Sequence, residues 1–452
     1  MDTSYDVRIW KIETYEGKRG RSYYVRWAVA GKPWREPFKV KALAESFRAD
    51  LMTAARKGEG FDIETGRPAS AARPDQAMTW YDFACAFADM KWPRVAATTR
   101  RTHAEALTAV TVLMLSGTAG KPGDQAIRHA LCRWAFNTQC RAGAPADVQA
   151  TLRWVARHCR TVSSLRKPEV LRSVLDGLTV RLDGTPAAPS VISRRRKILN
   201  TAVEYAVERR ILPANPVPAL KWKAPRTAHA VDRRSVANPG QVRSLLEAVR
   251  EQKRSGARVV AFFGCLYFAA MRPEEAAALN KSNLSLPAEG WGRIHLVGAE
   301  PHAGKDWTDS GKNRDKRQLK QREIGEGRDV PCPPELTSLL HWHMETFGTA
   351  PDGRLFTGER NGGELPKGTI NKAWRLARRA AFTPEVAASP LASTPYDLRH
   401  AAVSTWLNGG VPPTDVAAWA GHSVEILFKI YAKCLDAGED MLRQRVQAAL
   451  GH

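Results

Sequence analysis

Three side chains near the C-terminus could together carry out chemistry on a phosphate ester. Arg399, in the segment Tyr-Asp-Leu-Arg-His, offers a permanently charged guanidinium that can hold a phosphate through two parallel hydrogen bonds. His422, in Ala-Gly-His, can exchange a proton near neutral pH. Tyr431, nine residues after that histidine, carries a phenol that becomes a nucleophile when nearby cations stabilise its phenolate. Their order and spacing predict one shared site.

Short helices separated by glycine would bring these residues together. The apolar segment 401–407 ends at Asn-Gly-Gly, and a second helix that opens at two prolines stops at Gly421. Ser423 is placed to cap a third helix, which carries Tyr431. The two glycine stops therefore fold the arginine, the histidine and the tyrosine back toward one place.

This pattern resembles the active-site segments of the tyrosine recombinases, or phage-integrase family, and in particular integrases of actinobacterial phages and integrative plasmids. The resemblance covers mainly the second half of the chain. It implies DNA strand exchange through a 3′-phosphotyrosyl link on Tyr431, with no cofactor and no metal. It also implies a second arginine, a lysine and an N-terminal half that grips DNA.

The second arginine is expected at Arg272. It follows an apolar segment, 259–270, that is predicted to be a buried helix, and it precedes a proline and two glutamates that suit the start of the next helix. A cation at such a junction needs a partner, so Arg272 is either a structural partner of Glu275 or part of the site. The family carries Arg-x-x-Glu here, which implies that Arg272 contacts the scissile phosphate and that Glu275 supports the fold of the site.

The lysine is expected in a Lys-rich excursion, residues 304–327, between predicted strands at 294–297 and 328–331. In the family a lysine on a hairpin at this point protonates the leaving oxygen. The candidates are Lys305, Lys312, Lys316 and Lys320. Lys320 is favoured because Leu-Lys precedes the Val-Pro strand much as the family's lysine does.

One position departs from the family. The residue three before Arg399, usually His or Lys in the family, is Tyr396. Tyr396 can donate a hydrogen bond to a phosphate oxygen, but a phenol is a poor proton acceptor at neutral pH. Tyr396 as the nucleophile is the weaker alternative, because Tyr431 keeps the spacing from His422. His400 is expected to be buried and hydrogen-bonded, in support of the site.

The composition points to a nucleic-acid partner. The chain has 452 residues, with 69 Lys and Arg against 46 Asp and Glu, a formal net charge of +23 and a pI near 10.0. A protein this basic is expected to meet a polyanion, and no membrane span, signal peptide or amphipathic basic anchor stands out. Seven scattered cysteines without a Cys-x-x-Cys predict reduced thiols and no metal site. We expect a cytoplasmic, nucleoid-associated protein.

The predicted fold class is mainly α with small β-sheets, an α+β arrangement of tyrosine-recombinase type. Residues 1–62 are expected to form an arm-type DNA-binding module of β-sheet and one helix, with Leu43, Phe47 and Leu51 on one helix face. Residues 58–76 have a linker composition, and the linker proper is set at 63–76. A helical core-binding domain (77–220), a basic linker (221–238) and a mixed α/β catalytic domain (239–452) follow.

Several cations are expected to touch double-stranded DNA at the attachment sites, although a solvated face is the alternative for such runs. They are Arg26, Arg94, Arg100, Arg101, Arg194, Arg195, Arg196, Lys197, Lys221 and Lys223. The resemblance further implies a homotetramer on DNA, with a directionality factor and a host DNA-bending protein as possible partners. Residues 436–452, with Met441, Leu442, Val446 and Leu450 at helical spacing, could dock on a neighbouring subunit or pack on their own domain.

Two other functions share parts of this pattern. A type IB topoisomerase would use the same tyrosine chemistry to relax DNA, but the arm-like N-terminal module argues against it. A non-catalytic DNA-binding regulator could keep the basic surface and lose a catalytic residue, and Tyr396 together with the undecided lysine leaves this alternative open.

Overall fold

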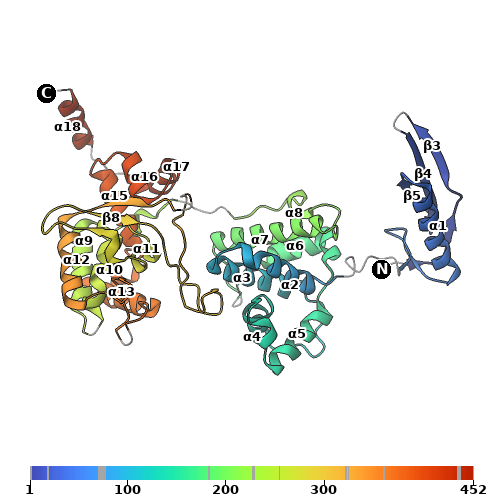
Figure 1. Cartoon of the computed structure of the whole chain (residues 1–452), viewed down its shortest axis with the longest axis horizontal. Helices are drawn as coiled ribbons and strands as arrows, with labels where there is room; N and C mark the ends of the chain where they lie inside the picture. The colour runs from blue at the N-terminus through green and yellow to red at the C-terminus, as the bar shows by residue number, and fades with distance from the viewer. Residues whose placement is uncertain are drawn as a thin grey trace. The chain divides into compact units, whose positions relative to one another are not determined.

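The computed structural model describes residues 3–17, 20–69, 78–181, 184–225, 230–253, 255–320, 323, 325–359, 362–434 and 439–450. The backbone divides into two compact units, Met1–Val95 with Thr102–Pro225, and Ala96–Arg101 with Arg226–His452. Helices dominate both units and the sheets are small, as Figure 1 shows. The predicted α+β class, mainly helical, is confirmed.

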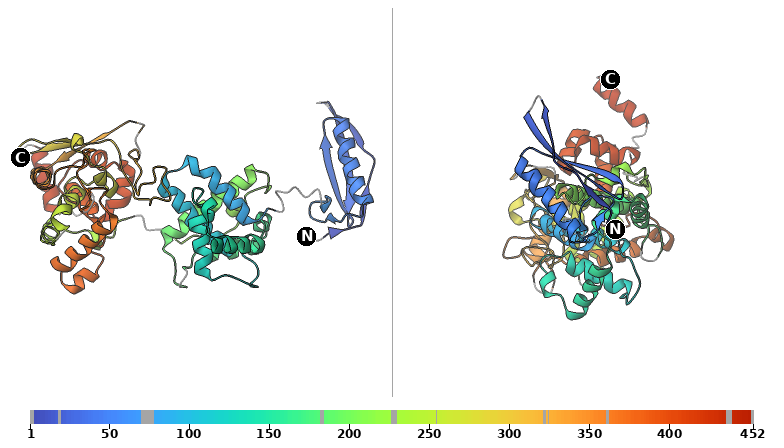
Figure 2. Two further views of the ribbon diagram at one scale, coloured as in Figure 1. Left: turned by 60° about the horizontal axis from the view of Figure 1, so that its bottom comes forward. Right: turned by 90° about the vertical axis from the view of Figure 1, so that its right-hand side faces the viewer.

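The N-terminal module is an antiparallel sheet with one helix on it. Its strands are β2 (Val7–Ile9), β3 (Glu13–Gly17), β4 (Gly20–Val29) and β5 (Lys32–Phe38). Since β5 pairs along most of β4, β2 and β3 must share the other edge of β4, one after the other. Helix α1 (Lys41–Arg56) lies along one face of this sheet (Figures 1 and 2).

The core of the module lies between β4 and α1. Alternate residues of β4 face the helix: Val25, Trp27 and Val29. On α1 the buried residues include Ala44 and Leu51, whereas Leu43 is 58% exposed. The predicted contact face was therefore wrong at Leu43. The helix turns Ala44 rather than its larger neighbour toward the sheet.

The module also extends further along the chain than its composition predicts. Strand β6 (Phe61–Asp62) pairs with β1 (Thr3–Ser4), and the Phe61 side chain is fully buried. The indole Nε1 of Trp27 donates to the carbonyl of Gly66. Residues 63–69 are thus packed on the module, and assigning them to a linker was wrong. The Gly- and Pro-rich composition reflects a tight return turn rather than a flexible tether.

Gly66 allows a sharp test of this return turn. Gly66 and Gly58 both have left-handed backbones, with φ of +66° and +69°. A Cβ on Gly66 would lie 2.5 Å from the Trp34 ring, whereas a Cβ on Gly58 would meet nothing within 4 Å. Gly58→Ala should cost about 1 kcal/mol of backbone strain, and Gly66→Ala about 1–3 kcal/mol more from crowding.

Hydrogen exchange of residues 3–69 in the full-length chain would measure both variants. Protection should fall clearly further in Gly66→Ala than in Gly58→Ala. Equal protection in the two variants would show that residues 63–69 do not pack as described.

The remainder of the first unit is helical. Its helices are α2 (Trp80–Lys91), α3 (Ala97–Leu113, whose first turn belongs to the second unit), α4 (Asp124–Ala130), α5 (Ala146–His158), α6 (Pro168–Gly177), α7 (Pro189–Glu208) and α8 (Pro216–Ala219). Thr79 caps α2 through its side chain, as predicted. On α7, Arg194 and Lys197 are exposed, while Arg195 and Arg196 are partly buried.

The second unit surrounds the buried helix α10 (Gly256–Phe268), which packs against α9 (Pro239–Arg250), α12 (Pro334–Phe347) and α15 (Asp397–Asn408). A three-stranded antiparallel sheet, in the order β7 (Leu284–Ser285), β8 (Gly292–Leu296), β9 (Arg328–Cys332), forms its second layer. The remaining helices are α11 (Pro273–Ala277), α13 (Lys367–Ala381), α14 (Pro384–Ala388), α16 (Pro413–Ala420), α17 (Val424–Tyr431) and α18 (Glu439–Ala449).

Part of the predicted basic linker belongs to this unit. The backbone N–H of Val231 donates to the carbonyl of Ile430 at 2.9 Å, and Ala237 is buried in the core. The prediction of a linker was therefore wrong for residues 230–238. Asn238 and Gln241 form a capping box that starts α9.

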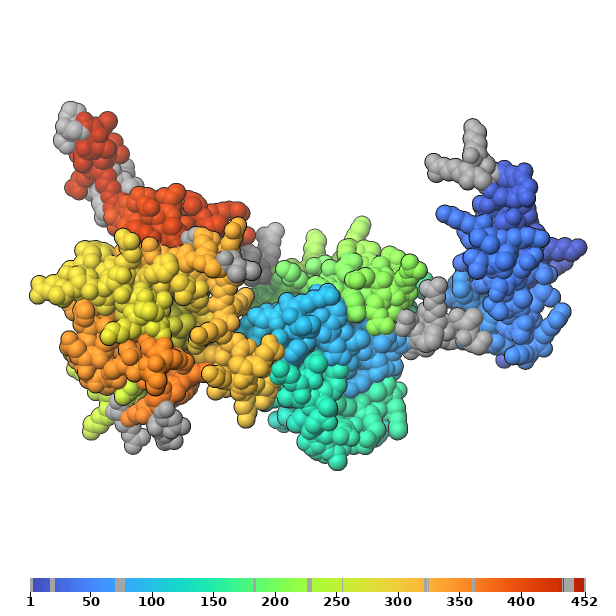
Figure 3. All heavy atoms as spheres, viewed as in Figure 1, coloured from blue at the N-terminus to red at the C-terminus, as the bar shows by residue number. Residues whose placement is uncertain are grey.

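Helix α18 projects from this unit (Figure 3) and contacts it through Arg445, whose Nη2 donates to the Asn408 carbonyl at 3.4 Å. Its Val446 and the following Leu450 are 58% and 69% exposed. The side chains of Met441 and Leu442 lie outside the described residues. Through the part of the chain that the structure describes, no helix combines the length and apolar character needed to cross a membrane.

Candidate active site

The site is built on one buried carboxylate. Glu275 is 1% exposed and stands three residues after Arg272 at the start of α11. One oxygen accepts from the backbone N–H of Arg272 at 2.8 Å, the other from its Nη1 at 2.7 Å. Pro273 supplies a backbone suited to the first helical turn. The short sequence thus fixes both side chains locally.

A third residue, Arg328, completes this cluster. Its Nη1 and Nη2 donate to the two oxygens of Glu275 at 2.8 and 2.6 Å, and its Nε donates to the Trp419 carbonyl at 3.0 Å. Burial alone would raise the pKa of Glu275, but the hydrogen bonds and charge of Arg328, together with Arg272, lower that pKa to about 2. The carboxylate is therefore ionised at any working pH.

Gly421 connects this cluster to α16. Its φ of +64° ends the helix in the left-handed conformation, as predicted. Its carbonyl accepts from Nη2 of Arg272 at 2.8 Å. A Cβ at this position would lie 2.7 Å from Nη1 of Arg328. Both the backbone and the close approach of the guanidinium groups require glycine here.

Arg399 is completely buried at the start of α15. Its guanidinium donates to the carbonyls of Ala270 and Ala420, the latter at 2.5 Å. Ala270 has a φ of +44°, a conformation that residues with a side chain rarely adopt, and this turn directs its carbonyl at Arg399. The Nε of Arg399 has no hydrogen-bond partner among the described residues. Burial lowers the pKa of Arg399, and the charge of Arg272 adds to this effect.

His422 lies between the arginines and the predicted nucleophile. Its Nε2 is 2.8 Å from Nη2 of Arg399. An arginine can only donate, so Nε2 is the acceptor and the proton of the neutral ring is on Nδ1. Burial lowers the pKa of His422 to about 3, and the charges of Arg399, Arg272 and Arg328 contribute. His422 is therefore neutral near pH 7.

Tyr431 ends α17 behind His422. Its ring is stacked on that of His422 at a centroid distance of 6.1 Å, and it is 1% exposed. Its hydroxyl lies 2.9 Å from Nδ1 of His400. Burial raises the pKa of Tyr431, and the charge of Arg399 opposes this rise only in part. Ser423 caps α17 as predicted.

An open hollow of about 670 Å³ lies in front of these residues. Its lining residues are Arg272, Arg317, Gln318, Leu319, Lys320, Tyr396, His422 and Ile426. The structure thus brings Lys320 and Tyr396 beside Arg272 and His422. Arg399 and Tyr431 do not line the hollow. They lie behind it.

Lys320 is the predicted lysine that reaches this hollow. Its side chain is 53% exposed, and its Nζ lies 3.7 Å from Glu274. Lys316, in the same excursion, lines a neighbouring hollow instead. Lys305 and Lys312 line neither.

Sequence reasoning missed two arginines here, Arg328 and Arg317. Arg328 begins β9 in Arg-Asp-Val-Pro. Because a cation at the start of a buried strand needs a hydrogen-bonding or anionic partner inside the protein, this position could have been recognised from the sequence. Arg317 gave no such sign. Its backbone pairs with Ala299 through hydrogen bonds of 2.7 and 2.8 Å, and its side chain lines the hollow without a hydrogen bond or ion pair to any described residue.

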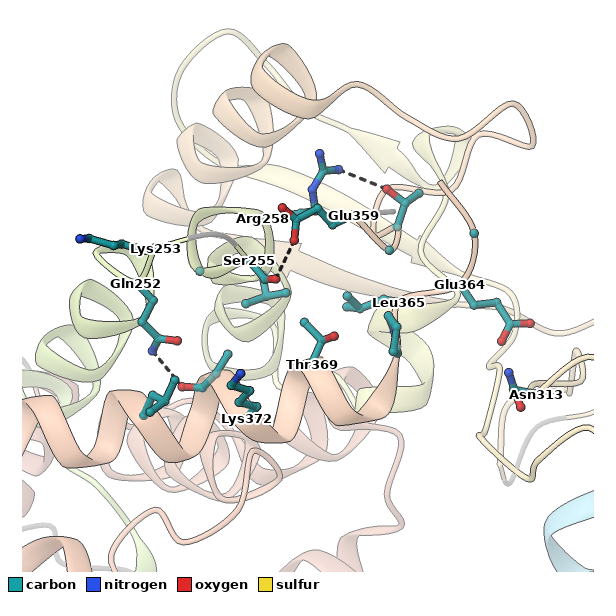
Figure 4. A pocket seen from close by; sticks show the side chains of 18 of the residues that line it. Gln252, Lys253, Ser255, Arg258, Asn313, Glu359, Glu364, Leu365, Thr369 and Lys372 are labelled. Atoms are coloured by element: carbon teal, nitrogen blue, oxygen red, sulfur yellow. Dashed lines mark hydrogen bonds between the residues drawn. The ribbon is translucent and has the colours of Figure 1, made fainter. Parts of the chain in front are cut away.

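A further hollow, of about 720 Å³, lies elsewhere in this unit (Figure 4). It is lined by polar side chains that include Arg258, Glu359 and Lys372, and some of these already bond one another. Of the predicted site residues, only Lys312, a disfavoured candidate for the catalytic lysine, lines it. Its size alone gives no reason to place chemistry there.

The cations predicted to touch DNA have varied surroundings. Arg94, Arg101, Lys221 and Lys223 are exposed. Arg26 is exposed and forms an ion pair with Glu13 at 2.7 Å. Arg100 is 6% exposed and bonds both oxygens of Asp309 at 2.7 and 2.8 Å. A DNA contact by Arg100 would have to compete with this ion pair.

Comparisons with known proteins give structural neighbours only. No family model and no curated protein matches the chain. The Tn1549 transposon integrase in complex with transposon right-end DNA is 15% identical, with 76% of this chain and 99% of that chain covered and a TM-score of 0.48. The XerH site-specific recombinase bound to difH is 13% identical (82% and 96% covered, TM-score 0.48). A lambda integrase tetramer bound to a Holliday junction is also 13% identical (92% and 97% covered, TM-score 0.46). These likenesses are too distant to carry an argument about activity, which must come from the residues themselves.

Neutralising Glu275 should destabilise the second unit. In Glu275→Gln the guanidinium groups of Arg272 and Arg328 would lose their shared negative partner, and breaking a buried ion pair costs about 3–5 kcal/mol. Glu274→Gln is the matched control, because the one ion pair of Glu274 among the described residues is a 3.7 Å approach to the half-exposed Lys320, and its carboxylate bonds none of the buried guanidinium groups. This variant should change stability by about 0.5 kcal/mol or less.

Hydrogen exchange at α10 in the full-length chain, followed in increasing urea, would measure both variants. The two variants losing protection equally would contradict this account of the cluster.

Proposed function

We propose that this chain is a tyrosine recombinase, a site-specific DNA integrase that cuts and rejoins DNA through a covalent 3′-phosphotyrosyl intermediate. One observation carries the proposal. Arg399, His422 and Tyr431, which are far apart in the sequence, contact one another in that order, and Arg272 bonds the carbonyl of Gly421, the neighbour of His422. Arg272 and His422 line one hollow. A structural role for each residue alone would not require their convergence.

The charges at the site favour a phosphate. Three buried guanidinium groups (Arg272, Arg328 and Arg399) carry three positive charges, and among the described residues Glu275 is the one carboxylate that bonds any of them. After pairing with the Glu275 carboxylate, two of these three positive charges remain uncompensated beside the hollow. An anionic phosphodiester would supply one negative charge, and a second develops at the phosphorus centre in the transition state, where a site arranged in advance this way stabilises it.

The proposed reaction needs a nucleophile, two phosphate-binding cations and an acid. The Tyr431 oxygen attacks phosphorus while Arg272 and Arg399 hold the non-bridging oxygens. Lys320 protonates the leaving 5′ oxygen. His422 donates from its ring to the phosphate or assists proton transfer, and Tyr396 can donate a hydrogen bond to a phosphate oxygen. A 5′-hydroxyl from a partner strand then reverses the step, so the phosphodiester energy is conserved without a cofactor.

DNA binding must rearrange the site before this reaction. Arg399 and Tyr431 are buried behind the hollow, and the phenol is bonded to His400 rather than directed outward. His422, which lines the hollow in front of Tyr431, would have to shift together with α17. The negative charge of a phosphodiester arriving at the arginines would favour this change, since it offsets the repulsion between the guanidinium groups.

The N-terminal module offers a second DNA-binding surface. On the sheet face opposite α1, Arg26 and Arg35 are paired across β4 and β5. The guanidinium of Arg35 lies 3.6 Å from the centroid of the Tyr24 ring, and that of Arg26 lies over Trp10. Cations stacked on aromatic rings along an exposed sheet suit insertion into a DNA groove. We assign this face to arm-type sites.

The proposed assembly is a homotetramer at the attachment sites, aided by a directionality factor and a host DNA-bending protein, in the nucleoid of the cytoplasm. The exposed Val446 and Leu450 along and after α18 favour docking on a neighbouring subunit over packing in cis. Four active sites are needed because strand exchange between two duplexes cuts four strands.

Replacing Tyr431 by Phe tests the nucleophile. A binding duplex is first selected from a random-sequence pool with Tyr431→Phe, and nicked versions of it are then incubated with wild type, Tyr431→Phe and Tyr396→Phe in EDTA. Wild type and Tyr396→Phe should give a protein-linked DNA band on a denaturing gel, and Tyr431→Phe none. Mass spectrometry of the nuclease-treated band should place the nucleotide on Tyr431.

The other outcomes separate the alternatives. A band that persists in Tyr431→Phe and disappears in Tyr396→Phe would move the nucleophile to Tyr396. Tight, sequence-specific binding without any band would favour the regulator. Covalent cutting with relaxation of supercoiled DNA, but no joining of paired sites, would favour the topoisomerase.

A sulfur substitution tests the role of Lys320. A thiolate leaves without a proton, so a substrate with sulfur in place of the bridging 5′ oxygen does not need a general acid. Lys320→Ala should slow cleavage of the normal substrate by about 10²–10⁴-fold and cleave the sulfur substrate as fast as wild type. Lys316→Ala, from the same excursion, should match wild type on both. If instead Lys316→Ala is slow on the normal substrate and reaches the wild-type rate on the sulfur substrate, the general acid is Lys316 and not Lys320.

A further inference from the structure

The predicted nucleophile has a base already in contact with it. The Tyr431 hydroxyl and Nδ1 of His400 are 2.9 Å apart, and their rings are tilted at 60° with centroids 5.6 Å apart. Among the described residues, His400 is the one hydrogen-bond partner of this hydroxyl. His400 is on α15 directly after Arg399, whereas Tyr431 ends α17, so the contact joins the two helices that carry the site.

Burial keeps both groups of this pair neutral before DNA binds. Burial lowers the pKa of His400 to about 4, Arg399 adds to this effect, and Asp397 opposes it. The carboxylate of Asp397 is occupied by the backbone N–H of Thr394 at 2.7 Å. A neutral imidazole with its proton on Nε2 leaves Nδ1 free to accept from the phenol.

No other group at the site is as well placed to accept this proton. His422 uses Nε2 to accept from Arg399, and three guanidinium charges lower its pKa to about 3 after burial. Tyr396 stacks edge-on against His400 at 5.0 Å and offers only another phenol. The remaining groups that face His400, namely Arg399 and Asp397, are a permanent cation and a carboxylate already bonded elsewhere.

We propose that His400 is the general base of the cleavage step, taking the proton of Tyr431 as the phenol oxygen attacks phosphorus. The role rests on the recombinase function proposed above. The Oη–H bond breaks with the proton passing to Nδ1, and the Oη–P bond forms. The P–O5′ bond breaks with its electron pair on O5′, which takes a proton from Lys320. On rejoining, the tyrosine oxygen leaves and recovers its proton from His400.

This assignment links catalysis to DNA binding. Without substrate, burial and the charge of Arg399 disfavour the protonated imidazole of His400, and Asp397 opposes them only in part. A phosphate in the hollow offsets the charges of Arg272 and Arg399, and this raises the proton affinity of His400 at the moment the nucleophile is needed. The tyrosine is then activated only in the presence of its substrate.

The primary test is His400→Gln in the full-length chain, measured on the selected nicked duplex. Glutamine can still accept a hydrogen bond but cannot take a proton, so cleavage should slow by about 10²–10⁴-fold while DNA affinity stays within twofold. His341→Gln is the matched control, because His341 bonds the Pro287 carbonyl from α12, away from the site, and should cleave at the wild-type rate.

A more acidic nucleophile separates a base from a structural support. With 3,5-difluorotyrosine at position 431, the phenol ionises readily and depends less on a base. Fluorination should restore cleavage by His400→Gln at least tenfold and change the wild-type rate little. A loss of packing around Tyr431 would not be rescued in this way.

Two outcomes would overturn the proposal. If His400→Gln cleaves as fast as wild type or faster, the contact only restrains the tyrosine. If fluorination of Tyr431 does not restore cleavage by His400→Gln, His400 does not act as a base. Failure of the recombinase function itself looks different. In that case wild type forms no covalent band at all, and the role of His400 falls with it.

Discussion

The buried carboxylate of Glu275 is the constraint on which the rest of the site depends. Two guanidinium groups share it, one from the start of α11 and one from the start of β9. A single carboxylate cannot satisfy two arginines completely, so their remaining N–H groups reach the carbonyls of Gly421 and Trp419 at the end of α16. One ionised side chain thereby fixes three elements that are separated by up to about 150 residues, and it orients Arg272 beside the hollow.

The backbone around this cluster is adapted to the same end. Ala270 and Gly421 both have left-handed backbone conformations. As a result, the carbonyl of Ala270 is directed at the guanidinium of Arg399, and that of Gly421 at the guanidinium of Arg272. Backbone carbonyls can orient an arginine without neutralising it. The site therefore holds its arginines rigidly while leaving positive charge in excess, a combination that suits transient binding of a phosphate better than permanent structural ion pairing. The unfavourable conformation at Ala270 is a cost that packing elsewhere in the unit must offset.

Much of this arrangement was predictable from local sequence. The capping pattern at Arg272 to Glu275, the glycine stop at Gly421 and the cap at Ser423 are each encoded within a few residues, and all are present. The failures concern tertiary contacts. Composition assigned residues 63–69 to a linker because it cannot report that Trp27, 39 residues earlier, donates to Gly66. Arg328 was missed for the same reason, since its partner lies in another element. His400 was recognised as hydrogen-bonded, but its partner was not.

The two histidines show why a partner matters more than a residue type. Both are neutral imidazoles beside the same tyrosine, yet Arg399 donates to His422 and thereby fixes its tautomer with the proton on Nδ1. That ring can donate to a phosphate and has no free acceptor. His400, one residue after the arginine, faces the phenol with an acceptor of its own. The fold thus gives the two roles to different residues: His422 donates to the substrate, and His400 accepts the proton of the nucleophile. It does so through a single hydrogen bond from Arg399, the residue that would also bind the phosphate, so the arrival of DNA acts on both histidines at once.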